Sequence, residues 1–343
     1  TPTPPPDTVA TLAVCGDVMS HMPVTNDAWS EAPGGYDYTP IFGDAVPLVT
    51  RADYAVANLE TTLADEPPYS GYPAFRSPSA LAGDLAEAGF DLLLTANNHC
   101  LDRGYDGLTS TLDALDRAGL AHVGTSRGPE EDAQGPYLAD VGGISVAFLG
   151  YTYGTNGIPL PEGRDYAVSL FNTDYLTTLS TPDTQRLEEG LAAAKALDPD
   201  LIAVLIHWGV EYQSTQNDAQ EALADLLIAN GADLVLGGHP HVLQPMELRT
   251  VDAPGGSRTG FVCYSLGNFI SSQVDPYTDI TAVLTLELTK DGTTGETGVT
   301  GWTYAPMEMV REEGAAQVFR LTAAGSGSAA ALHCQEVLGS SVD

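Results

Sequence analysis

The stretch "TVATLAVCGDVMSH", residues 8–21, joins an almost continuous apolar run to a Gly-Asp pair, with Met19 and His21 at the next alternate positions. An apolar run of this length, rich in Val and Leu, is typical of a strand buried on both faces. Asp17 therefore falls at the carboxyl end of a buried strand. A single Asp in such a place is usually a turn or helix-cap residue, so its meaning depends on how the other strands end.

Strand patterns of the same kind alternate with amphipathic segments along the chain. Strand patterns occur at residues 52–60, 90–99, 143–151, 200–209 and 232–241, and helical periodicity occurs at residues 79–89, 105–119, 181–197 and 214–231. This alternation predicts an α/β fold in which helices cover both faces of the strands. Three further strand patterns, at 260–270, 279–292 and 298–310, follow one another directly and predict a mixed or second sheet in the C-terminal part.

The two ends of the chain differ in composition from its middle. Residues 1–8 are proline-rich and predict a linker, residues 9–322 predict one domain, and residues 323–343, rich in Ala, Gly and Ser, predict a poorly ordered tail with at most one short helix. The linker favours an extracellular domain tethered to a bacterial membrane or cell wall through an N-terminal segment. A chain end without such meaning is the alternative. No apolar run approaches the length of about 18 residues that spans a bilayer.

Charge and cysteine content narrow the class of protein. Thirteen basic and 46 acidic residues give a net charge of −33, which disfavours binding to nucleic acid and requires a local cation cluster or metal for any polyanionic substrate. The four cysteines lack C-x-x-C spacing, which excludes a zinc ribbon. Cys15 and Cys263 lie in apolar strands and are expected to be buried thiols, whereas Cys100 and Cys334 could form a disulfide in an oxidising compartment.

Polar side chains recur where the predicted strands end. They are Asp17, Asn58, Glu60, Asn97, Asn98, His99, His207, His239 and His241. Ligands of open α/β sheets bind in the crevice outside the carboxyl ends of the strands, so these side chains are expected at one edge. Carboxylate, amide and imidazole donors without thiolate suit Zn, Mn or Fe. The set exceeds what one ion needs, which predicts two divalent metal ions with a carboxylate bridge that activate a water for hydrolysis.

The order of the motifs "GDVM", "NLE", "ANNHCLDRG", "HWGVEY", "GGHPHVLQP" and "YSLGNF" resembles that of the bacterial capsule-synthesis proteins of the CapA type, which are associated with poly-γ-glutamate. That family is similar to calcineurin-like metallophosphoesterases, and the resemblance runs from about Ala10 to Phe269. It implies an α/β fold built as a layered αββα sandwich of mixed sheets, with a metal site at the C-terminal ends of the strands.

The resemblance also implies roles for individual residues. Asp17 and His241 would bind the first metal, Glu60 would bridge, and the second metal would be held by Asn98, His207 and His239. His99 would be an acid beside the leaving group, steadied by Asp102. The remaining motif residues, expected on the substrate side, are Asn58, Arg76, Arg103 and Glu211; for the two arginines a solvated surface position is the alternative.

One position departs from the superfamily pattern. Phosphoesterases of this fold usually carry His two residues after the first Asp, where this chain has Met19, and a thioether is a poor ligand for hard divalent ions. His21 could replace the missing imidazole if the segment stays extended, because alternate side chains of a strand share a face. The alternative is that His21 only packs in the following loop.

Three functions are consistent with these observations. The first is an exported metal-dependent hydrolase that cleaves a phosphoester or an amide-linked anionic cell-envelope polymer such as poly-γ-glutamate, in the setting of a capsule-synthesis membrane complex. The second is a non-catalytic, polymer-binding accessory of poly-γ-glutamate synthesis or export, which Met19 favours. The third is a sugar- or nucleotide-phosphate phosphatase, which rests on the superfamily resemblance alone.

Overall fold

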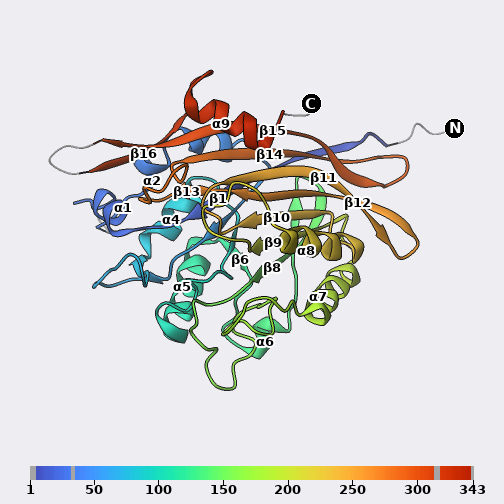
Figure 1. Ribbon diagram of the computed structural model, residues 1–343, viewed down its shortest axis with the longest axis horizontal. Coiled ribbons are helices and arrows are strands. Elements are labelled where there is room, and N and C mark those ends of the chain that lie inside the picture. The colour runs from blue at the N-terminus through green and yellow to red at the C-terminus, as the bar shows by residue number, and fades with distance from the viewer. Residues whose placement is uncertain (1–4, 32–34, 313–316, 341–343) are drawn as a thin grey trace.

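Two mixed β-sheets packed against each other form the centre of the computed structural model, which describes residues 5–31, 35–312 and 317–340 (Figure 1). In spatial order, the first sheet contains β16 (Val318–Ala323), β15 (Thr297–Glu312), β14 (Ile280–Lys290), β1 (Thr8–Val18), β2 (Tyr54–Leu59), β5 (Leu92–Leu94) and β6 (Ala121–Val123), with β13 (Asn268–Ile270) paired to β1. The second contains β11 (Leu243–Ala253), β12 (Gly256–Leu266), β10 (Leu234–Gly238), β9 (Leu201–His207), β8 (Ile144–Thr152) and β7 (Tyr137–Val141). A separate pair is formed by β3 (Leu63–Ala64) and β4 (Ser77–Pro78).

The second sheet has a parallel centre and antiparallel edges, whereas the parallel half of the first sheet runs to its edge strand β6 and the antiparallel strands lie at the opposite edge. Strands β1, β2, β5 and β6 run parallel, as do β8, β9, β10 and β12. The sequence predicted either a mixed sheet or a second sheet for the C-terminal strands. These strands join the two sheets instead of forming one of their own: β14 pairs antiparallel with β1, and β12 pairs parallel with β10. Both sheets are therefore mixed, and the carboxyl ends of their parallel strands supply the edge at which the predicted ligands meet.

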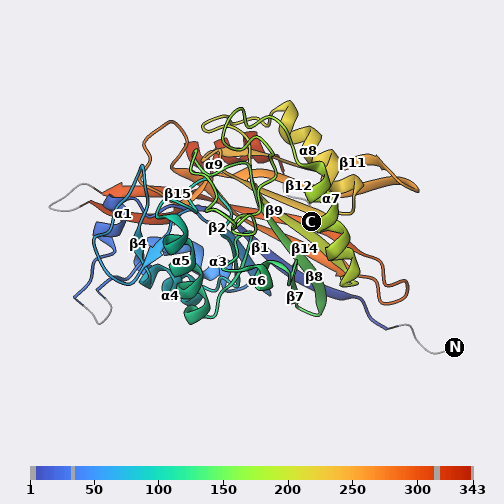
Figure 2. The same cartoon turned by 90° about the horizontal axis from the view of Figure 1, so that it is seen from below.

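Helices such as α4, α5, α7 and α8 cover the outer faces of the two sheets, whereas α9 packs against strands of both sheets (Figure 2). The bounds of the helices are α1 (Met22–Asp27), α2 (Thr39–Phe42), η1 (Gly43–Ala45, a 3₁₀ turn), α3 (Val46–Val49), α4 (Ala80–Glu87), α5 (Gly104–Ala118), α6 (Pro129–Asp132), α7 (Thr184–Ala196), α8 (Asp218–Ala229) and α9 (Ala329–Leu338). Helix α8 begins with a reciprocal capping box between Asn217 and Gln220, and α5 ends at Gly119 in the left-handed conformation. The capping box explains why α8 begins at Asp218, after the predicted start at 214, and Gly119 explains why α5 ends where the periodicity predicted.

Strand β9 shows why these segments read as continuous apolar runs. Ile202 and Val204 face the cluster under α7 and α8, whereas Leu201 and Ala203 face the core between the sheets. Because both faces are buried, no polar alternation is left in the sequence. The expected α/β sandwich is confirmed.

The short helix considered for the C-terminal tail is confirmed as α9, but α9 is part of the core, so the expected poor order is wrong for residues 329–338. Ala330, Cys334 and Leu338 of α9 are buried against β11, β14 and β15, and α9 lies along these strands in Figure 1. Small residues such as Ala suit a helix packed closely on a sheet, and their abundance was misread as disorder. At the other end, Thr8 already belongs to β1, while residues 1–4 of the predicted linker lie outside the described residues.

The four cysteines are free thiols and all are buried. The disulfide considered for Cys100 and Cys334 is not formed: Cys100 follows β5, whereas the thiol of Cys334 lies 3.6 Å from the carbonyl oxygen of Thr281 in β14. Across the described part of the chain, no helix combines the length and the apolar character needed to cross a bilayer.

Candidate metal centre

The predicted ligands converge at the carboxyl ends of strands from both sheets. Asp17 lies in the end of β1 and Glu60 directly follows β2, while His207 ends β9. Asn98 follows β5, and His239 and His241 follow β10. All six are buried, with at most 4% of any residue exposed. The topology thus brings together side chains more than 200 positions apart, as the strand-end argument required.

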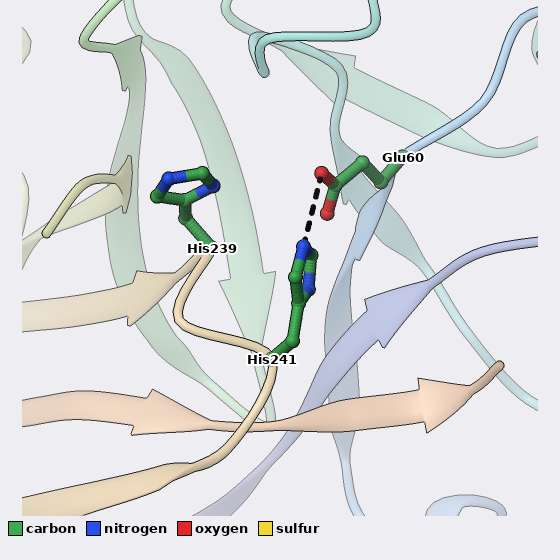
Figure 3. A group of neighbouring side chains, drawn as sticks. All are labelled: Glu60, His239 and His241. Atoms are coloured by element: carbon green, nitrogen blue, oxygen red, sulfur yellow. Dashed lines mark ion pairs between the residues drawn. The ribbon is translucent and has the colours of Figure 1, made fainter. Parts of the chain in front are cut away.

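Two groups of ligand atoms share Glu60. Atoms of Asp17, Glu60 and His207 lie within 4.8 Å of one another, and so do atoms of Glu60, His239 and His241. Figure 3 shows Glu60 and the two imidazoles of the second group reaching toward a common space. The resemblance instead placed His241 with Asp17 and His239 with His207, so the assignment of ligands to each ion remains a prediction. A shared carboxylate is what a bridge between two ions requires.

The carboxylate of Asp17 is held by groups of the second sheet. Its Oδ2 accepts the backbone N–H of His239 at 3.1 Å and lies 3.1 Å from Nδ1 of His241. A Cβ atom at Gly238 would lie only 2.6 Å from Oδ1 of Asp17. The glycine before the first histidine therefore leaves the space that this carboxylate occupies.

Asn58 lies among the ligands rather than on the substrate side. Its Nδ2 donates to Asp17 Oδ1 at 2.8 Å and to Glu60 Oε2 at 3.3 Å, and lies 3.2 Å from His207 Nδ1. Asn97 in turn donates from Nδ2 to the backbone carbonyl of Leu59 at 2.7 Å. Such outer hydrogen bonds fix the orientation of metal ligands.

The charges and the unpaired atoms of the centre fit a divalent cation. Oε1 of Glu60 and Nδ1 of His239 are buried and have no hydrogen-bond partner within the described structure. Burial opposes charge on Glu60, but His207 and His241 hold the pKa of its carboxyl below its usual range. Burial likewise opposes charge on His241, but Glu60 and Asp17 raise its pKa to about 9. Protonated imidazole thus supplies the positive charge that bound cations would replace, and these oxygen and nitrogen donors suit Mn, Zn or Fe.

The His-Pro-His turn at residues 239–241 does not have an extended backbone. His239 and His241 both have left-handed backbone conformations, with φ of 99° and 58°. Their ring centroids are 5.7 Å apart, and His239 lies 4.7 Å from the ring of His207. Non-glycine residues keep such conformations where surrounding contacts impose them, which is common at functional sites.

His99 and Asp102 form a hydrogen-bonded pair beside the ligands. Nδ1 of His99 lies 2.7 Å from Oδ2 of Asp102, which also accepts the backbone N–H of Phe75 at 2.6 Å. Burial opposes protonation of His99, but the bond to Asp102 and the charge of Glu60 outweigh it and raise the pKa of the imidazole. The Phe75 ring packs edge-on against the imidazole at 4.8 Å. Nε2 is consequently the nitrogen available to a substrate.

Neither Met19 nor His21 belongs to the two ligand groups found in the described residues. Met19 is 1% exposed and is part of the buried interior. Strand β1 ends at Val18, and His21 occupies the N-cap position of α1 without a side-chain cap hydrogen bond. The imidazole of His21 interacts electrostatically with Glu60, His99 and His241, so its role as a ligand stays a prediction. Its Nδ1 accepts the backbone N–H of Ser272 at 3.4 Å, and burial lowers its pKa to about 4.

The other residues expected on the substrate side are divided by the structure. Arg76 donates to the backbone carbonyls of Glu66 and Pro68, and Arg103 donates to the backbone carbonyl of Ala74, so both guanidinium groups brace one loop. Glu211 lies at the centre, with Oε1 3.9 Å from Nε2 of His241.

Two residues that the sequence reasoning missed come from the segment after β8. Tyr153 stacks on His207, with 6.1 Å between ring centroids, and lies 4.7 Å from His239. Asn156 accepts from Asn98 Nδ2 at 3.1 Å. The strand pattern at 143–151 was recognised, and the same strand-end rule applied to it would have found Tyr153.

The fold agrees with comparisons to known proteins. The fold is that of the calcineurin-like phosphoesterases: the crystal structure of the calcineurin-like phosphoesterase YfkN from Bacillus subtilis aligns over 88% of this chain and 91% of that one, with a TM-score of 0.50 and 15% identity. The family model for the bacterial capsule synthesis protein PGA_cap matches residues 11–273, and the chain belongs to this family.

Curated relatives carry related names. The capsule biosynthesis protein CapA of Bacillus anthracis is 29% identical over 82% of this chain, and the PGA biosynthesis protein CapA of Bacillus subtilis is 27% identical over 84%. A probable polyglutamine synthesis accessory protein of Mycobacterium tuberculosis is 26% identical over 60%. The chain spans 65% and 70% of the two CapA proteins, about two thirds of their length.

Proposed function

We propose that the protein is a metal-dependent hydrolase of capsule-polymer metabolism that cleaves a phosphoester. The observation that carries this proposal is the two buried ligand groups that share the Glu60 carboxylate, whose Oε1 has no hydrogen-bond partner among the described residues and lies 3.4 Å from Nε2 of His207. When bound, two divalent cations supply an activated water and polarise the group to be cleaved. Asp17, Glu60, Asn98, His207, His239 and His241 would hold them.

The protein's own groups account for the remaining chemistry. Asp102 fixes the imidazole of His99 through Nδ1, so that Nε2 can donate a proton to the leaving oxygen. Phe75 and the low exposure of the pair, 4% and 2% of the two side chains, keep bulk water from this proton. Asn58 keeps the Asp17 and Glu60 carboxylates oriented.

The test is hydrolysis of bis-p-nitrophenyl phosphate and of poly-γ-glutamate by the purified protein. We expect the diester to be cleaved, chelation to abolish cleavage, and Mn or Zn to restore it. His207→Ala should lose the activity, whereas His333→Ala, a histidine of α9, should keep it. Cleavage that survives both chelation and His207→Ala would overturn the proposal.

A non-catalytic accessory role is the second candidate. It is favoured by Met19, which packs in the interior where related phosphoesterases would offer an imidazole, and by the accessory role named for the mycobacterial relative. Metal bound without hydrolysis of either substrate would support this role. An extracellular location, beside a capsule-synthesis membrane complex, stays a proposal that cell fractionation can test.

A further inference from the structure

Two cavities open beside the metal centre and together form what we term the cleft. The first, about 590 Å³, is bounded by the loop at residues 72–74, by Asn98 to Asp102 and by the segment 153–179. The second, about 570 Å³, lies between the segment 171–182 and the start of α8, and reaches His239. Tyr153, Leu179 and Glu211 line both cavities. A substrate whose reacting group meets the metals can therefore place its flanking groups in the cleft.

The cleft has no side-chain ammonium or guanidinium group. Among the described residues that line the two cavities, none is Lys or Arg. The two arginines predicted on the substrate side, Arg76 and Arg103, line neither cavity, and each donates from one guanidinium nitrogen to backbone carbonyls of the neighbouring loop. The lining does contain two carboxylates, of which Asp102 is paired with His99 while the Glu211 side chain is 44% exposed. A carboxylate on the flanking part of a ligand would meet repulsion without a lysine or arginine to neutralise it.

The lining offers instead flat rings and neutral hydrogen-bonding groups. Tyr72, 74% exposed, lies 6.4 Å from the ring of His99, and Tyr175 lines the same cavity. Asn156 and Thr177 add an amide and a hydroxyl group, whereas the buried Thr155 hydroxyl donates to the carbonyl oxygen of Ile158. Aromatic faces combined with a few neutral donors and acceptors suit a ligand with an apolar face and several hydroxyls.

We propose that the group next to the cleaved phosphoester is an uncharged, polyhydroxylated unit of the glycosyl class, and that an arm bearing free carboxylates is rejected. This inference rests on the proposed function in that the metal centre binds the reacting group. A polymer with one carboxylate in every residue is therefore not the expected ligand of the cleft, because such a chain would need positive charges along the cleft as well as at the metals.

Binding of two matched ligands tests the inference without requiring turnover. Glucosylmethylphosphonate and glucuronosylmethylphosphonate differ by one carboxylate, and their C–P bonds are not hydrolysed. Titrated calorimetrically into the Mn-loaded protein, the glucosyl ligand should bind at least tenfold more tightly. Equal affinity, tighter binding of the glucuronosyl ligand, or binding of neither overturns the inference. Failure of the proposed function would show differently, as absent diester hydrolysis with the ligand preference intact.

A substitution at the rim tests the electrostatic cause. Leu176 lines the first cavity and is 46% exposed, so a lysine there places a cation beside the ligand arm without disturbing the core. Leu176→Lys should narrow the affinity gap at least threefold at low salt, and added salt should reverse the gain. Leu176→Gln, similar in length and uncharged, should keep the wild-type gap. An unchanged gap in Leu176→Lys, with both variants melting like wild type, would refute electrostatic selection.

Discussion

Replacing Gly238 by Ala perturbs the metal centre through a single contact. The added Cβ would lie 2.6 Å from Oδ1 of Asp17 and 3.8 Å from Nδ2 of Asn58. Since non-bonded atoms need about 3.5 Å, the carboxylate must move by roughly 0.9 Å. Asp17 is fully buried, and this shift stretches its bonds from Asn58 and from the His239 N–H, 2.8 and 3.1 Å long.

The expected cost has two parts. Overpacking of a filled interior destabilises by about 1–3 kcal/mol. Displacement of a ligand with its supporting hydrogen bonds lowers metal affinity by about 10- to 100-fold. Calorimetric titration with Mn or Zn measures the affinity, and thermal unfolding of the metal-free protein measures the stability.

Gly83→Ala is the matched control. Gly83 lies inside α4, with no atom within 4 Å of an added Cβ, so alanine should leave metal binding unchanged and stabilise the helix by about 0.5–1 kcal/mol. If Gly238→Ala binds metal with wild-type stoichiometry and affinity, the placement of Asp17 as a ligand held by this contact is refuted.

Three further predictions concern the acid pair, the tail and the thiols. Asp102→Asn should lower kcat for the aryl diester by about 10²-fold or more while metal content stays at the wild-type value, because His99 loses the group that fixes it; loss of metal in this variant would contradict that role. Leu338→Ala, at a buried position of α9, should lower the free energy of unfolding by about 2–4 kcal/mol in a denaturant titration. Leu332→Ala, at a position 56% exposed on the same helix, should change the free energy of unfolding by less than about 0.5 kcal/mol. Equal effects of the two variants would contradict the packing of α9 in the core. Burial raises the pKa of Cys100, Cys263 and Cys334 to about 12 and also raises the pKa of Cys15. At pH 8 the folded protein should therefore resist thiol reagents, and unfolding should expose four reactive thiols. Detection of only two thiols after unfolding would indicate a disulfide.

The sequence predicted that the candidate ligands converge, because this prediction depends only on the topology of the sheets. Buried parallel strands such as β1 and β9 can be recognised in the sequence as apolar runs. The polar residue that ends each run lies at the edge shared by the strands. Asp17, Glu60 and His207 could be found in this way without knowledge of side-chain positions. Tyr153 was missed only because no polar residue was sought after β8.

Other features depend on local geometry that residue spacing does not contain. Whether His21 faces the metals depends on where β1 ends, and a strand boundary shifts by a residue or two without leaving a mark in the pattern. Arg76 and Arg103 were expected near an anionic substrate because they are positively charged. In the structure both guanidinium groups donate to backbone carbonyls of one loop. Helix α9 was taken for a tail because alanine and glycine are common in loose segments, whereas here Ala330 allows close packing on the sheet.

The proposed function requires bound metal ions at the shared edge of the two sheets. Elemental analysis of the purified protein, dialysed against excess Mn or Zn and then freed of unbound ion, gives the metal-to-protein ratio directly. We expect two ions per chain in the wild type and fewer in His207→Ala and His239→Ala. The metal-to-protein ratio of His333→Ala should equal that of the wild type. A wild-type protein that retains no metal, or a ratio that neither ligand substitution lowers, would contradict the proposed function.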